Sequence, residues 1–437
     1  MAPDFNTLRR LVLAAINDRV VPGLVIAAGQ GGQVSVLEAF GQRQVEPEPA
    51  TATVETVYDL ASLTKAVVTS LLVMKGVGDG LLQLDRPLGD HLAVFAGRPE
   101  VTLRRVLAHA GGFPAHRKFY DSAVVKTGAG QAHRSSLINL AAAEPLVYQP
   151  GSQSIYSDLG FILLGALVEQ VMSERLDVLA ERLLFQPLGL STLGFVDLLA
   201  AGPQAKFRGH DVAPTERCPV RGRMVVGEVH DLNAFAMGGI AGHAGLFGGI
   251  QDLLQLAFAL CAAYHGRGVV STDINQGVTE KIGTPSPRLT GEKVGMRGPA
   301  GASPSPQPSP RGDAGRGGGV LRSPQLDGRG TGGGAPIVRR EILREFWRPA
   351  GIPGSTWRLG WDGPAAQGSL AGTLISRQAV GHLSFTGCSL WIDPEQEACV
   401  VVLTNRIHPE VRDDPRFRAL RPALNDAALQ AIGYRAG

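Results

Sequence analysis

Ser62 and Lys65 stand three residues apart at the predicted start of a buried helix, where they could form an activated nucleophile. Residues at this spacing share one face of a helix, so the lysine amine can reach the serine hydroxyl. The helix N-terminus favours negative charge on the serine oxygen. Of the seven lysines in the chain, only this one has a serine three residues before it. A serine that caps the helix beside a solvated lysine would give the same tetrapeptide. The tetrapeptide alone therefore does not favour an activated nucleophile over this structural role.

Tyr156 and His382 supply two further groups in chain order. Tyr156 opens a second predicted helix, where a phenol can relay a proton between serine, lysine and leaving group, although a lone tyrosine there more often packs. His382 lies in the stretch 381–387, directly before a predicted strand at the edge of a sheet. Three candidate chemical groups therefore follow one another along the chain.

The elements expected around these residues are helices and antiparallel strands. Apolar residues at helical spacing predict helices over 62–75 and 158–173, and glycines between two β-rich runs predict a hairpin over 24–28 and 34–37. Strands are expected at 389–392 and at 399–404, whose valine run indicates a buried central strand. Asp414 before Pro415 predicts the cap of a last helix that ends near Ile432 and is kinked by Pro422.

Together these elements predict one α+β domain over 1–437, with an antiparallel sheet flanked by N- and C-terminal helices. Residues 1–60 and 337–437 are expected to form the sheet body, and 61–283 an inserted lobe of helices and loops. Residues 284–336 form a low-complexity insertion rich in proline and glycine. Such a tract buries too little apolar surface to offset its ordering entropy, which predicts disorder, with a docking site for a partner as the alternative.

Composition excludes several classes of partner. A formal net charge of +3 over 437 residues gives no basic stripe for nucleic acid. The apolar runs are far shorter than a membrane span, and Leu11 to Ile16 is too short for a secretory signal. We therefore expect a cytoplasmic protein with a small-molecule partner and an oligomeric state that the sequence leaves open.

Four cysteines are spaced without a metal-ligand pattern, and free thiols are the expectation for a chain without an export signal. Cys388 and Cys399 could alternatively face each other across a hairpin. His230, Asp231 and His243 match no zinc signature, and loop hydrogen bonding is the better interpretation. The same structural role is expected of His109 and His116.

At this point the sequence resembles the β-lactamase-related serine hydrolases, a family of class C β-lactamases, low-mass penicillin-binding proteins and carboxylesterases. The signature is S-x-x-K, then Y-x-N or a variant, then K-T-G or H-x-G. Further phrases similar to the family's are Leu107 to Pro114, Gly227 to Asp231, Gly242 to Phe247 and Leu359 to Asp362. The likeness spans nearly the whole chain except the insertion.

The resemblance implies a β-lactamase/transpeptidase-like fold and a role for each motif residue. Ser62 would form an acyl-enzyme, and Lys65 and Tyr156 would shuttle protons. The backbone N–H groups of Ser62 and Phe385 would form an oxyanion hole, with each donor worth about 3 to 4 kcal/mol to the transition state. Neither a cofactor nor a metal is implied. A tryptophan such as Trp361 more often packs in the core than contacts substrate, yet its position before the third motif places it near a plausible wall of the cleft.

Three residues depart from the family pattern. Asp158 replaces the usual Asn with an acceptor-only group, which could also cap the helix that follows. His382 replaces the lysine of K-T-G, removing a permanent cation that would hold a substrate carboxylate. Ser384 occupies the motif's glycine, so its Cβ could narrow the cleft.

These departures favour carboxylic esters as substrates. A D-alanyl-D-alanine carboxypeptidase or β-lactamase is the alternative within the enzyme class. A catalytically impaired binding or regulatory relative is the alternative outside it, motivated by Ser384 and the insertion. The α/β-hydrolase signature G-x-S-x-G is absent.

Overall fold

The computed structural model describes residues 5–122, 131–200, 207, 210–268 and 336–435. The predicted insertion at 284–336 lies outside the described residues apart from Pro336, so its disorder stays a prediction.

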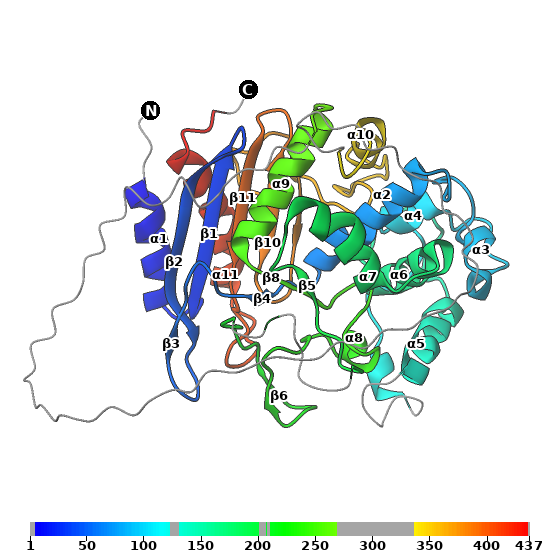
Figure 1. The fold of residues 1–437 in the computed structure, drawn as a ribbon, viewed down its shortest axis with the longest axis horizontal. Coiled ribbons are helices and arrows are strands. Elements are labelled where there is room, and N and C mark those ends of the chain that lie inside the picture. Colours follow the sequence, from blue (N-terminus) through cyan, green and yellow to red (C-terminus); the bar gives the residue numbers. More distant parts are fainter. Residues whose placement is uncertain (1–4, 123–130, 201–206, 208–209, 269–335, 436–437) are drawn as a thin grey trace, which may run out of the picture.

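A six-stranded antiparallel sheet forms one side of the molecule, in the order β3-β2-β1-β11-β10-β9 (Figure 1). Its strands are β1 (Gly23–Gln30), β2 (Gln33–Gln44), β3 (Ala50–Thr51), β9 (Val380–Leu383), β10 (Ser389–Asp393) and β11 (Ala398–Leu403). The two ends of the chain therefore meet in one sheet, because β1 pairs with β11.

Helices cover both faces of this sheet. Helices α1 (Phe5–Asn17) and α11 (Pro415–Ala431) pack on one face, and α9 (Ile250–Tyr264) packs on the other (Figure 1). The sequence of β11 fits this burial, since Val400 and Val402 join the core under α1 and α11 while Val401 joins the core on the α9 side. The continuous valine run is thus a strand buried on both faces, as predicted.

The helical lobe lies beyond the β9 edge of the sheet and is built from short helices. These are η1 (Lys65–Ser70), α2 (Leu71–Gly78), α3 (Leu88–His91), η2 (Ala93–Phe95), α4 (Leu103–Leu107), η3 (Phe119–Asp121), α5 (Gln131–Ala143), α6 (Asp158–Met172), α7 (Leu176–Ala180), η4 (Glu181–Phe185), η5 (Gln186–Leu188) and α8 (Leu232–Ala236). From the C-terminal segment, α10 (Arg340–Phe346) packs against α9 and α2. A three-stranded sheet of β4 (Tyr58–Asp59), β8 (Leu246–Gly248) and β5 (Gly194–Phe195) joins lobe and body, and β6 (Arg217–Cys218) pairs with β7 (Arg223–Met224).

Most predicted elements are confirmed within a few residues. The hairpin, the buried strand, the edge position of β9 and the helix from Asp158 are all present. Asp414 caps α11 by accepting a hydrogen bond from the Arg416 N–H, with Pro422 inside the helix. The first buried helix begins with Leu63 and Thr64, directly after Ser62, and continues as a π-helix over Lys65–Ser70, so Ser62 lies in the turn at its start.

All four cysteines are buried free thiols. The suggested pairing of Cys388 with Cys399 is wrong, because Ile392 lies opposite Cys399 in the β10–β11 register. Cys399 instead contacts Cys261 of α9, with 3.8 Å between the two Sγ atoms. Among the described residues, no helix combines the length and apolar character needed to cross a bilayer.

Candidate active site

Ser62 sits in a strained turn between β4 and the π-helix. Ala61, the residue before it, has a left-handed φ of 43°, which a non-glycine residue adopts only when its surroundings hold it. Asp59 at the end of β4 stabilises this conformation, because its Oδ1 accepts a hydrogen bond of 2.8 Å from the Ala61 N–H. Its Oδ2 accepts another, of 2.7 Å, from the His230 N–H. A buried carboxylate therefore fixes the turn that presents Ser62.

Lys65 is fully buried and points its ammonium group at three oxygen atoms. Its Nζ lies 3.1 Å from Ser62 Oγ, 2.9 Å from the His243 carbonyl oxygen and 2.8 Å from Asp158 Oδ1. The structure thus brings Ser62 and Lys65 into the contact that their spacing predicts.

Asp158 decides the charge of this pair. Burial alone lowers the pKa of Lys65, but the Asp158 carboxylate and Tyr156 outweigh burial, so the pKa of Lys65 lies above its usual value. Burial likewise raises the pKa of Asp158, yet the Lys65 charge and a hydrogen bond from His116 hold it well below its usual range. The resting site therefore contains an ammonium group and a carboxylate.

Tyr156 lies directly before α6, with Lys65 Nζ 4.9 Å from the centre of its ring. The Tyr156 side chain therefore lies beside the Ser62–Lys65 pair. Burial raises the pKa of Tyr156, and the Lys65 charge only partly opposes this, so the group is a neutral phenol at physiological pH. It can donate a proton to a leaving group beside Ser62.

His382 on β9 is the third motif residue, and it is neutral. Burial, followed by the Lys65 charge, lowers the pKa of His382 to about 3. A carbonyl oxygen only accepts, so Nδ1 carries the proton and donates it to the Leu383 carbonyl at 2.8 Å. Nε2 is then an acceptor, buried and without a partner among the described residues. This position offers no cation to a substrate.

Ser384 turns its hydroxyl into the protein. Its Oγ lies 2.8 Å from Thr386 Oγ1, which in turn donates to the Asp59 carbonyl oxygen at 2.8 Å. Because the single Thr386 proton is used there, Ser384 is the donor in the first bond. Only 4% of Ser384 is exposed. The side chain that replaces the motif's glycine is therefore held by the core.

Phe385 occupies the turn between β9 and β10, and the bond from Thr386 to Asp59 ties this turn to the strand that leads into Ser62. In the described part of the chain, the N–H groups of Ser62 and Phe385 have no protein acceptor. Both are thus available to an oxyanion. The Phe385 ring is 48% exposed and stacks on His230 with 5.4 Å between ring centres.

Trp361 does not line the cleft, contrary to the expectation. It is fully buried and packs edge-on against Trp347, with 5.6 Å between ring centres. Trp357, four residues earlier, takes the expected position. Its ring stacks on Tyr156 at 5.5 Å and lies 5.6 Å from the ring of His382. Sequence reasoning missed Trp357 because this irregular segment has no period that assigns faces.

Asp158 does not cap α6, contrary to the alternative expected from the sequence. Ser157 holds the N-cap position of α6, and Asp158 turns its carboxylate to Lys65 and to His116, whose Nδ1 lies 3.1 Å from Oδ2. His116 thus hydrogen-bonds to a neighbour of Lys65, and its structural role stays a prediction. His109 is buried beside Tyr156 and accepts from the Ser157 N–H.

The other histidines hydrogen-bond within loops, as expected. His230 pairs with Glu216 at 3.0 Å and His243 with Asp231 at 2.9 Å. Among the described residues, no cluster of three metal-ligating side chains occurs.

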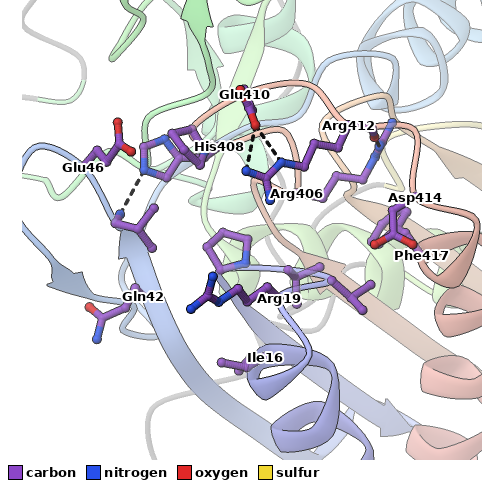
Figure 2. Close-up of a pocket in the computed structure, with 15 residues that line it drawn as sticks. Ile16, Arg19, Gln42, Glu46, Arg406, His408, Glu410, Arg412, Asp414 and Phe417 are labelled. Carbon is purple, nitrogen blue, oxygen red and sulfur yellow. Dashed lines mark hydrogen bonds and ion pairs between the residues drawn. The ribbon is translucent and has the colours of Figure 1, made fainter.

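A cavity of about 440 Å³ lies apart from these residues, between the ends of α1 and β2 and the segment after β11 (Figure 2). Neither Ser62 nor Tyr156 lines it. One wall is Arg406, whose Nε donates to the Phe385 carbonyl oxygen. Each acidic side chain in its wall forms an ion pair. Glu410 pairs with Arg412 (Figure 2), Glu46 with Arg217 and Asp414 with Arg416. We do not assign this cavity to the substrate.

Fold and site together define a serine hydrolase of the acyl-transfer type. The chain belongs to the Beta-lactamase family, whose profile matches residues 8–425. Curated relatives include two Escherichia coli proteins provisionally named D-alanyl-D-alanine carboxypeptidases. The O157:H7 protein is 28% identical, covering 91% of this chain and 81% of the relative. The K12 protein is 29% identical, covering 84% and 73%.

Solved structures with the same fold include a hydrolase and a penicillin-binding protein homologue. EstCE1, described as a hydrolase with promiscuous acyltransferase activity, superposes with a TM-score of 0.61 at 18% identity, covering 97% of both chains. The octameric penicillin-binding protein homologue from Pyrococcus abyssi gives 0.61 at 19% identity, covering 99% of this chain and 78% of that one. At these identities the likeness shows the β-lactamase/transpeptidase-like fold alone.

Proposed function

We propose that the protein hydrolyses carboxylic esters through an acyl-enzyme on Ser62. The observation that carries this proposal is the neutral, buried His382 at the place where relatives that bind a substrate carboxylate have a lysine. β-Lactams and D-Ala-D-Ala peptides carry that carboxylate, whereas a simple ester does not. Because the site has no lysine cation at this position, it favours an uncharged ester over a substrate that carries a carboxylate.

The reaction follows from the contacts around Ser62. Oγ attacks the ester carbonyl carbon, and its proton passes to the groups around it, through the hydrogen bond with Lys65 and the neighbouring phenol of Tyr156. The N–H groups of Ser62 and Phe385 receive the developing oxyanion. The bond to the alcohol oxygen then breaks, and the neutral Tyr156 phenol supplies a proton to the departing alcohol. Water repeats the sequence on the acyl group and releases the acid.

Aromatic side chains support an apolar substrate. Trp357 stacks on Tyr156, and the exposed Phe385 lies in the turn between β9 and β10. Such surfaces bury acyl or alcohol groups without requiring charge.

A D-alanyl-D-alanine carboxypeptidase is the second candidate, because the curated relatives carry that name. Purified protein should be assayed on short p-nitrophenyl esters, a chromogenic cephalosporin and a D-Ala-D-Ala peptide, with Ser62→Ala as control. We expect Ser62-dependent turnover of the esters and weak turnover of the other two. Rapid release of D-alanine without ester turnover would overturn the proposal in favour of the second candidate.

We also propose the domain division expected from the sequence, with 1–60 and 337–437 as the sheet body, 61–283 as the lobe and 284–336 as a dispensable insertion. Deletion of residues 299–334 should leave the melting temperature and activity nearly unchanged, and a large loss of either contradicts this. The cytoplasmic compartment remains a prediction from the sequence.

A further inference from the structure

Four side chains form an unbroken line of hydrogen bonds from the nucleophile toward solvent. Ser62 Oγ lies 3.1 Å from Lys65 Nζ, which lies 2.8 Å from Asp158 Oδ1. Asp158 Oδ2 lies 3.1 Å from His116 Nδ1. The exposed fraction of the side chain rises along this line, from 0% for Lys65 through 17% for Asp158 to 41% for His116. Of these three side chains, His116 is the most exposed, so it can exchange protons with water.

Lys65 cannot accept the Ser62 proton as the site stands. Its amine already carries three protons, because the Asp158 carboxylate holds it in the ammonium form. An ammonium group has no lone pair to offer. The proton must therefore pass to a further acceptor, and Asp158 is the carboxylate already hydrogen-bonded to Lys65.

We propose that Asp158 accepts a proton from Lys65 while Lys65 takes the proton of Ser62, and that the charge on His116 determines whether Asp158 can do so. The inference rests on the proposed nucleophilic role of Ser62. Asp158 and His116 thereby gain roles that the serine and lysine motif alone does not contain.

Atoms and charges balance in this step. The Ser62 O–H bond breaks as the bond from Oγ to the carbonyl carbon forms, and one N–H bond of Lys65 forms as another breaks to give Asp158 its proton. Lys65 remains an ammonium group throughout, and the negative charge moves from Asp158 to the oxyanion. When the alcohol departs with a proton from the site, Asp158 returns its proton through Lys65. No oxidant or cofactor enters.

His116 acts on Asp158 from the side opposite Lys65. The charged groups that act most strongly on its ring are Asp158 on α6, which is its hydrogen-bond partner, Asp231 at the start of α8 and Lys65 in the π-helix. An imidazolium ring stabilises the Asp158 carboxylate and makes it a poorer proton acceptor, whereas a neutral ring leaves it free. The hydrogen bond with Asp158 raises the pKa of His116. Activation of Ser62 should therefore increase as pH rises through that value.

The test measures the second-order rate of Ser62 labelling by a fluorophosphonate from pH 5 to 9, with circular dichroism as a check of folding. As pH falls through the pKa of His116, the wild-type rate should fall, about tenfold in all, to a lower plateau set by the imidazolium form. His116→Gln replaces the ring with a permanently neutral group, so its rate should lose this fall. His116→Lys places a permanent cation there and should label slowly at every pH. His210→Gln, an exposed histidine elsewhere, should keep the wild-type profile.

Two outcomes overturn the inference while leaving Ser62 as nucleophile. The first is a wild-type acid limb that persists in His116→Gln. The second is a rate lowered by one common factor at all pH values in both His116 variants, which is the mark of a structural role. Failure of the wild type to label at Ser62 would instead overturn the proposed function together with this inference. The labelling readout does not depend on the ester assignment.

Discussion

Lys65 Nζ and Asp158 Oδ1 lie 2.8 Å apart, with Lys65 fully buried and 17% of the Asp158 side chain exposed. This ion pair sets the resting charge of the site, because each partner holds the other ionised against the effect of burial. It also distinguishes the chain from the family signature, in which an uncharged amide faces the lysine.

The pair predicts strong coupling between Lys65 and Asp158 in stability. Asp158→Asn leaves a buried ammonium without its carboxylate, and Lys65→Met leaves the carboxylate without its cation. Each single variant should lose about 3 to 5 kcal/mol in free energy of unfolding. The double variant should lose less than either, since no unpaired charge remains. Urea denaturation of all four proteins measures this, and additive losses would contradict the pairing.

The same contact predicts how stability depends on acid. Because the pKa of Asp158 is lower in the folded than in the unfolded chain, the unfolded chain binds more protons as pH falls. This contribution is complete above the ordinary aspartate pKa and is lost as pH falls through the lower, folded value. Melting temperatures from pH 7 to 3 should therefore fall less steeply in Asp158→Asn than in the wild type. Parallel curves would show that Asp158 is not the group responsible.

Ser384→Gly tests whether the departure from the motif restricts the cleft. The Ser384 hydroxyl donates to Thr386 within the core, so its removal should cost about 1 kcal/mol of stability. Since the side chain points away from the cleft, kcat/KM for short esters should change by less than about threefold, which is under 1 kcal/mol. Ser384→Ala separates the hydroxyl from backbone flexibility. A tenfold gain in the glycine variant would mean that Ser384 obstructs substrate.

Trp357 and Trp361 should respond in opposite ways to truncation. Trp357→Ala removes the ring stacked on Tyr156, worth about 0.5 to 1.5 kcal/mol, so kcat/KM should fall roughly twofold to tenfold. Trp361→Ala creates a cavity in the core and should lower the free energy of unfolding by about 3 to 5 kcal/mol. Steady-state kinetics and urea denaturation of both variants decide this. A kinetic defect confined to Trp361→Ala would reverse the two assignments.

Local patterns predicted the elements that depend on local chemistry. The valine run predicted β11, because a strand covered by helices on both faces needs no polar side. The spacing of Ser62 and Lys65 predicted their contact, and the order of the motifs placed Tyr156 and His382 beside them.

Contacts between distant segments were not predictable in this way. Asp59 accepts hydrogen bonds from the N–H groups of Ala61 and His230, and His230 comes close to Asp59 only in the folded chain. His116 reaches Asp158 across 42 residues. No periodicity or short spacing encodes such pairs, because they depend on how β4, α6 and the intervening loops pack. The charge of Lys65 could therefore not be deduced from the tetrapeptide.

The central claim is that Ser62 carries the acyl group, and intact-mass spectrometry tests it most directly. The protein is mixed with a p-nitrophenyl ester and quenched in acid within the first turnovers. The mass of the intact protein is then measured. We predict one added acyl group, located by peptide mapping at Ser62 and missing from Ser62→Ala. An adduct that survives in Ser62→Ala, or ester turnover with no adduct at Ser62 in the wild type, would contradict the account.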